Sequence, residues 1–157
     1  MMRFFASLMF TSCLVPAAAQ AQNVELEPTF GEVTLSAGFE EDPHTVAVVS
    51  GGDIGASHLG GDCAGFVANA PDVRLHYKAG DFPLLFTVLS EGDTTLVVNA
   101  PDGQWHCDDD SWGDGDPLLS FSEPESGQYD IWIGSFQPSD NLEALLGVSE
   151  LEAMAGE

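Results

Sequence analysis

Short apolar runs separated by turn residues are the feature that most constrains the fold of this chain. Most runs are about five to nine residues long and end at Gly, Pro, Asn or Asp, and no convincing helical period appears before residue 141. Runs of this length are typical of strands, whereas an amphipathic helix repeats its apolar positions every three to four residues. The predicted strands are Gly31–Ala37, Thr45–Ser50, Val73–Lys78, Leu84–Ser90, Thr94–Asn99, Gln104–His106, Leu118–Phe121 and Gln128–Phe136.

The predicted architecture is all-β, a two-layer antiparallel β-sandwich of jelly-roll or Greek-key type. Residues 22–149 would form this one domain, and residues 150–157 a flexible acidic tail. The stretch Asn141–Met154 fits two structures, because its apolar residues could line a short helix or Leu145–Ser149 could be an edge strand. We favour the strand.

The predicted strand Gln128–Phe136 has a clear alternation of faces. Tyr129, Ile131 and Ile133 share one face and are predicted core residues. Trp132 must then point the other way, toward solvent, a second layer or a partner. Cover by a neighbouring loop is the interpretation that we favour.

The first 21 residues have the organisation of a secretory signal peptide. Arg3 precedes an apolar run, Phe4–Val15, which is followed by Pro16 and several alanines. The run is about 12 residues long, short of the ~20 needed to cross a bilayer, so no membrane span is predicted. Cleavage after Ala21 fits best, with Ala19 as the competing site. The mature protein is therefore expected to be periplasmic or secreted.

Removal of a signal peptide would also remove one of three cysteines, Cys13. A lipoprotein signal ending at Cys13 is an alternative, but Phe10 fits that processing signal poorly. In an oxidising compartment the remaining pair, Cys63 and Cys107, is predicted to form a disulfide, and two buried free thiols are the alternative. The four histidines show none of the paired spacings of closed zinc sites.

Charge narrows the range of partners. The chain has 26 Asp and Glu residues against 3 Lys and Arg, a net charge of −23. Loss of Arg3 with the signal peptide would leave 26 acidic and 2 basic side chains, a net charge of −24. Such a field repels nucleic acid and anionic lipid and favours divalent cations and basic partners. No nucleic-acid partner is expected.

Residues 108–116 form the densest acidic segment, with five carboxylates in nine positions. Neighbouring carboxylates repel one another, and calcium, which accepts about 6 to 8 oxygen ligands in irregular geometry, would offset that repulsion. The EF-hand pattern is absent, because Trp112 and Leu119 stand where it needs ligands. A solvated acidic loop is the alternative. The predicted calcium ligands, in an inter-strand loop, are Asp108, Asp109, Asp110, Asp114 and Asp116.

Catalytic motifs do not stand out. No Gly-x-Ser-x-Gly turn occurs, and a chain of this length offers a set such as Ser57, His58 and Asp62 by chance. We therefore expect a non-catalytic protein. One alternative is recognition of a secreted protein or a glycan through exposed tryptophans, and another is a peptidase-like enzyme. The tryptophans in question are Trp105, Trp112 and Trp132.

Residues 97–136 resemble the bacterial pre-peptidase C-terminal (PPC) domain. That family shows a strand, a Pro-Asp-Gly turn, an Asp-rich loop, a strand ending in Ser-Phe, a Ser-Gly turn and a Tyr-x-Ile-x-Ile-Gly strand. The whole mature chain is also similar to small secreted proteobacterial proteins that often carry a peptidase-like label. The matching elements are Val97–Asn99, Pro101–Gly103, Asp108–Asp116, Leu118–Phe121, Ser126–Gly127 and Tyr129–Gly134.

The resemblance implies a jelly-roll-like β-sandwich that often binds calcium, accompanies secreted enzymes and is usually not itself catalytic. It places the family's acidic loop on Asp108, Asp109 and Asp110, with Asp114 and Asp116 in a variable part. No protease domain is recognised in the sequence, so a peptidase label would be inherited by association. The expected function is that of a non-catalytic, calcium-binding domain.

Overall fold

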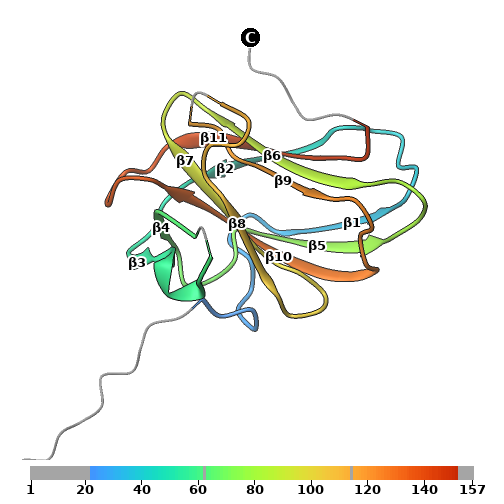
Figure 1. The fold of residues 1–157 in the computed structure, drawn as a ribbon, viewed down its shortest axis with the longest axis horizontal. Coiled ribbons are helices and arrows are strands. Elements are labelled where there is room, and N and C mark those ends of the chain that lie inside the picture. Colours follow the sequence, from blue (N-terminus) through green and yellow to red (C-terminus); the bar gives the residue numbers. More distant parts are fainter. Residues whose placement is uncertain (1–21, 62, 114, 152–157) are drawn as a thin grey trace, which may run out of the picture.

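The computed structural model describes residues 22–61, 63–113 and 115–151, which form two packed β-sheets (Figure 1). Sheet A contains β1, β5, β10, β7 and β8 with two short strands, β3 and β4, and sheet B contains β2, β11, β6 and β9. A short 3₁₀ helix, η1 (Ala56–Leu59), follows β3. The strands are β1 Glu32–Ser36, β2 His44–Val49, β3 Ile54–Gly55, β4 Phe66–Val67, β5 Val73–Lys78, β6 Leu84–Ser90, β7 Thr94–Asn99, β8 Trp105–Asp108, β9 Leu118–Phe121, β10 Gly127–Ser135 and β11 Glu143–Ser149.

The strand pairing is that of a jelly roll. With β1, β3 and β4 set aside, the first strand pairs with the last, β2 with β11, and the second with the second-last, β5 with β10. The inner pairs β6–β9 and β7–β8 continue the rule, and all four pairs are antiparallel. This nested pairing winds one long ribbon of strands into two sheets. The predicted β-sandwich is therefore confirmed.

β1 departs from the predicted antiparallel arrangement, because it pairs with β5 in parallel, from Glu32 opposite Arg74 to Ser36 opposite Lys78. Parallel neighbours need a long connection. The chain supplies one here by crossing to sheet B and back between β1 and β5. β1 thus extends sheet A without a hairpin.

The predicted strands are found with bounds that shift by a few residues, and the ambiguous C-terminal stretch is a strand, β11. β11 begins at Glu143, two residues before the predicted start at Leu145. β3 and β4 were not predicted. Two-residue strands have no periodicity in the sequence. They form here because β4 pairs with β10 and β3 pairs with β4.

The main core lies between the two sheets. Tyr129, Ile131 and Ile133 of β10 are buried there on one face, as predicted. Phe86 of β6 packs on Tyr129, with ring centroids 5.8 Å apart. Each such side chain contributes roughly 1.5–3 kcal/mol when it is fully buried, which makes this layer the main source of stability.

Trp132 lies on the other face of β10 and is fully buried, with 0% of its surface exposed. It belongs to a second, smaller core with Ala56, Val67 and Val97. The segment β3–η1–β4, green and teal in Figure 1, covers this face. A Cβ on Gly134 of β10 would lie 2.8 Å from the Phe66 carbonyl oxygen. The covering segment therefore lies so close to the sheet that only glycine fits at this position. Trp132 is therefore covered by a neighbouring segment of the chain, which is the interpretation favoured from the sequence.

Cys63 and Cys107 form the predicted disulfide, with Cα atoms 4.9 Å apart. The bond joins the covering segment to β8 and closes a span of 44 residues. In the same cluster, Trp105 of β8 packs against Trp132, with ring centroids 5.3 Å apart. The disulfide thus fixes the cover of the second core to sheet A.

The C-terminal end of the described chain is tied down at Glu150, which was predicted to begin a flexible tail. Its carboxylate accepts hydrogen bonds from the Gly38 N–H at 2.7 Å and from the Tyr77 hydroxyl. Its own N–H donates to Asp42 Oδ2 at 3.0 Å. The rest of that predicted tail, residues 152–157, and the predicted signal peptide lie outside the described residues. No helix in the described part of the chain has the length and apolarity needed to cross a bilayer.

Asp72, directly before β5, is a buried carboxyl with 3% exposure. Its Oδ2 accepts a hydrogen bond from the Ile133 N–H at 2.7 Å. Burial raises the pKa of Asp72 from 3.8 to about 7, and the hydrogen bond opposes that change only in part. Because the folded state keeps this proton to higher pH than the unfolded chain does, stability decreases as the pH rises from about 4 to about 7.

We expect Asp72→Asn to increase the free energy of unfolding by more than about 1 kcal/mol at neutral pH, because an amide oxygen keeps the hydrogen bond without a buried charge. Near pH 4 and below, the two proteins should differ much less. Urea unfolding across this pH range measures both effects. An unchanged pH dependence in the variant would contradict the assignment.

Removal of the disulfide in the Cys63→Ser/Cys107→Ser variant is expected to cost roughly 4 kcal/mol, because the unfolded chain regains the entropy of an open 44-residue span. Urea unfolding of the oxidised and substituted proteins measures the difference. Equal midpoints with equal slopes would show that the covering segment holds without the bond.

Candidate functional site

The acidic loop, residues 108–116, joins the end of β8 in sheet A to the start of β9 in sheet B. Its backbone closes on itself: Gly113 N–H donates to the Asp110 carbonyl at 3.0 Å, and Trp112 N–H to the Asp116 carbonyl at 3.2 Å. Gly113 and Gly115 have φ values of 99° and 83°, which residues other than glycine rarely adopt. The predicted inter-strand loop is a compact turn.

Asp108 holds this turn together. Its Oδ2 accepts hydrogen bonds from Ser111 N–H at 3.0 Å and Leu118 N–H at 2.8 Å, and its Oδ1 accepts one from the Ser111 hydroxyl. Backbone N–H groups bonded to a carboxylate stabilise its charge without a cation. Asp108 therefore has a structural role whether or not an ion is present.

Asp116 anchors the other end of the loop. Its Oδ1 accepts a hydrogen bond from Ser90 N–H, at the end of β6, at 3.2 Å. The loop is also bonded to β7, because Thr94 N–H donates to the Gly115 carbonyl at 3.1 Å. These contacts hold the acidic loop against the turn between β6 and β7.

That turn brings a further carboxylate to the loop, Asp93, which the sequence did not indicate as a ligand. A Cβ on Gly115 would lie 3.2 Å from Asp93 Cα, so the two backbones are in close contact. Partial burial raises the pKa of Asp93, and repulsion from Asp110 and Asp109 raises it further. Only the fold brings them together, since Asp93 is fifteen residues or more from both in sequence.

The predicted calcium ligands thus divide into two sets. Asp108 and Asp116 bond to backbone N–H groups, while Asp109 and Asp110 act electrostatically on Asp93. Asp114 lies outside the described residues. Among the residues that the structure does describe, no group of three or more His, Cys, Asp or Glu side chains is arranged to hold a metal ion. The described carboxylates do not form a finished metal site.

The three tryptophans do not share an exposed face. Trp132 is buried, Trp105 is half-buried against it, and Trp112 in the acidic loop is 43% exposed. The predicted exposed binding surface therefore does not include Trp132, because the β3–η1–β4 segment covers this side chain. Trp112 is the most exposed of the three, and Trp105 is only partly accessible to a partner.

The chance set of Ser57, His58 and Asp62 gains no support as a triad. Ser57 and His58 are exposed neighbours in η1, and the His58 ring bonds through Nδ1 to the Gly55 carbonyl oxygen at 2.8 Å. Asp62 lies outside the described residues. The His58 contact fixes the ring on its own turn.

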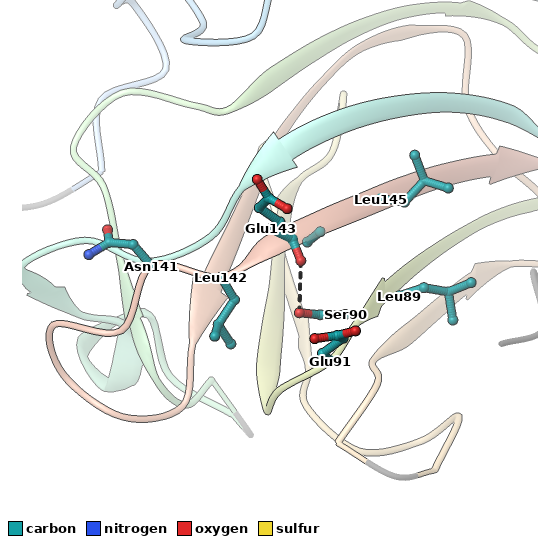
Figure 2. A pocket seen from close by; sticks show the side chains of 8 residues that line it. Leu89, Ser90, Glu91, Asn141, Leu142, Glu143 and Leu145 are labelled. Carbon is teal, nitrogen blue, oxygen red and sulfur yellow. Dashed lines mark hydrogen bonds between the residues drawn. The ribbon is translucent and has the colours of Figure 1, made fainter. Parts of the chain in front are cut away.

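A wide, open groove of about 700 Å³ lies between the end of β6 and the start of β11 (Figure 2). Leu89, Leu142 and Leu145 line it with two glutamates, Glu91 and Glu143. The hydrogen bond from Ser90 Oγ to the Glu143 carbonyl, 3.0 Å long, joins the two strands there. None of the three tryptophans borders this groove.

We expect Asp108→Ala to lower the free energy of unfolding by about 1–3 kcal/mol, because it leaves the partly buried Leu118 N–H and the exposed Ser111 N–H without this acceptor. Asp108→Asn should cost less, since its amide oxygen still accepts. Urea unfolding in the presence of chelator measures this effect without any contribution from an ion. Equal stability of all three proteins would contradict the anchoring role.

Comparison with known proteins does not assign the chain to a family. No protein-family model matches the chain, and no curated protein matches its sequence. The similarity to the PPC domain therefore stays a prediction from the motifs of residues 97–136. The function has to be argued from the loop and the surface.

Proposed function

We propose that this protein is a secreted or periplasmic, non-catalytic β-sandwich that binds calcium where the acidic loop meets Asp93. The observation that carries the proposal is the close approach of Asp93 to the acidic loop, where a Cβ on Gly115 would lie 3.2 Å from Asp93 Cα. Partial burial raises the pKa of Asp93, and repulsion from Asp110 and Asp109 raises it further. A bound divalent cation would turn this repulsion into attraction.

Calcium is the ion that we assign, because its oxygen ligands need no strict geometry and include backbone carbonyls and water. Asp108 and Asp116 would hold the loop in shape through the backbone N–H groups that they already accept from. The ion would lie on the side of Asp93, Asp109 and Asp110. Small adjustments of exposed Asp110 would be needed to complete its ligand shell.

The ion would stabilise the fold rather than take part in a reaction. It would link the β8–β9 loop to the β6–β7 turn. Each of these two connections joins a strand of sheet A to a strand of sheet B. A ligand at ~100 times its dissociation constant adds about 2.7 kcal/mol to the free energy of unfolding. The proposed role is therefore a domain that reaches full stability where calcium is abundant.

Secretion is proposed on two grounds, the organisation of residues 1–21 and the disulfide. Disulfides persist in oxidising compartments and are rare in the cytosol. Cys63 and Cys107 are bonded in this fold, and the bond covers the second core. An extracytoplasmic location also offers the millimolar calcium that weak sites require.

We expect millimolar calcium to raise the melting temperature of the protein above its value in chelator, by several degrees for a stabilisation of about 2 kcal/mol. Magnesium should have a smaller effect, because it demands a strict octahedron. Thermal unfolding followed by circular dichroism measures the shift. Equal melting temperatures with calcium and with chelator would overturn the proposal.

The Asp109→Asn/Asp110→Asn variant tests whether these two carboxylates change the melting temperature in opposite directions without and with calcium. Without calcium it should melt at or above the wild-type temperature, because repulsion is removed, and with calcium it should gain little. The matched control is Glu40→Gln/Glu41→Gln, which removes the same charge from two exposed neighbours outside the loop. An equal calcium shift in the loop variant and the control would place the ion elsewhere.

A further inference from the structure

A second, smaller hollow lies at the end of the sandwich where the β7–β8 turn and the β9–β10 loop meet. Its volume is about 150 Å³, below the ~300 Å³ of typical sites for whole small molecules, so it fits a head group. Three aromatic rings and three carboxylates dominate its lining. They are His106, Phe121, Tyr129, Asp102, Glu123 and Glu125.

The aromatic rings form the wall of this hollow. Phe121 of β9 lies at the centre, with its ring centroid 4.9 Å from that of His106 and 5.5 Å from that of Tyr129. Both contacts are edge-to-face, at interplanar angles of 71° and 77°. His106 and Phe121 are partly exposed, while Tyr129 is buried behind them. Because aromatic rings attract a cation that lies within about 6 Å, this wall favours a positive group.

The carboxylates form the rim. Asp102 comes from the β7–β8 turn and Glu123 and Glu125 from the β9–β10 loop, and all three are exposed. Their negative field reaches the wall: burial raises the pKa of Tyr129 to about 12, and repulsion from Glu125 and Asp102 contributes. No ion pair to any of these three carboxylates is found among the described residues.

Hydrogen bonds hold the rim in place. The Tyr129 hydroxyl donates to the Glu125 carbonyl at 2.9 Å, which fastens the β9–β10 loop to the buried ring. Asp102 Oδ1 accepts from Gln104 N–H at 2.9 Å, which fixes the β7–β8 turn. The wall and the rim are thus set before a ligand arrives, which reduces the cost of binding.

We propose that this hollow binds the ammonium head of a small organic cation, such as a quaternary alkylammonium. The partly exposed rings of Phe121 and His106 contact the apolar, positively charged head, and the carboxylates at the rim neutralise its charge. An inorganic divalent ion is a poor fit here, because the wall offers it rings in place of oxygen ligands. The site is separate from the acidic loop and does not depend on the calcium proposal.

Choline is the probe, and its control is the neutral dimethylbutanol in which carbon replaces the charged nitrogen. We expect millimolar choline to shift amide signals of residues 100–106 and 121–129 saturably in spectra of the isotope-labelled, disulfide-intact protein with chelator present. The neutral alcohol should bind at least several times more weakly. Equal binding of both would overturn a cation site, and so would the absence of a saturable choline shift.

Variants locate the charge that matters. Glu123→Gln/Glu125→Gln should weaken choline binding about threefold to tenfold, as expected for the loss of two exposed carboxylates near the cation. Glu40→Gln/Glu41→Gln removes the same net charge away from the hollow and should bind like wild type. If the two variants weaken binding equally, the general negative field attracts choline and the proposal is wrong.

Phe121→Leu tests the aromatic wall, because it keeps apolar bulk but removes the central ring. Choline affinity should fall about fivefold or more, as expected for a lost cation–π contact. The melting temperature of this variant shows whether it is folded under the conditions of the titration. Unchanged affinity in the folded variant would contradict the aromatic contact.

Discussion

Strand β10 is buried on both faces, and the rest of the structure depends on that constraint. It pairs with β5 along one edge and with β7 along the other, so its backbone is enclosed within sheet A. Tyr129, Ile131 and Ile133 face sheet B, while Trp132 needs a second cover on the opposite side. A two-layer sandwich cannot supply that cover. The β3–η1–β4 segment provides it, and the disulfide keeps it in place.

A chain with 26 acidic and 3 basic residues has too few side-chain cations to pair with all its carboxylates, and several of them use backbone donors instead. Among the described residues, Arg74 forms ion pairs with Asp130 at 2.7 Å and with Glu32 at 3.4 Å. It also donates to the carbonyls of Val24 and Leu26, which holds the N-terminal segment on sheet A. Several other carboxylates accept from main-chain N–H groups at loops and strand ends. This holds for Asp42, Asp72, Asp108, Asp116 and Glu150.

The periodicity of the sequence was sufficient to predict the strands of the main core, because alternation and turn residues are local signals. It was not sufficient to predict the second core: β3 and β4 are too short to show a pattern, and the burial of Trp132 depends on a segment 65 or more residues earlier. The acidic loop was found as a loop, and its partner Asp93 was not, because the approach of two turns is set by the jelly-roll pairing. Likewise, Phe121 and Tyr129 come from adjacent strands in sequence but from different sheets.

The placement of the tryptophans gives the protein an uneven set of internal fluorescent reporters. Trp105 and Trp132 lie together in the second core beside the disulfide, and Trp112 lies in the acidic loop. The buried aromatic residues of the main core are tyrosine and phenylalanine, among them Tyr77, Tyr129 and Phe86. Tryptophan emission therefore reports on the disulfide-bound cover and the acidic loop rather than on the main core, without any added label.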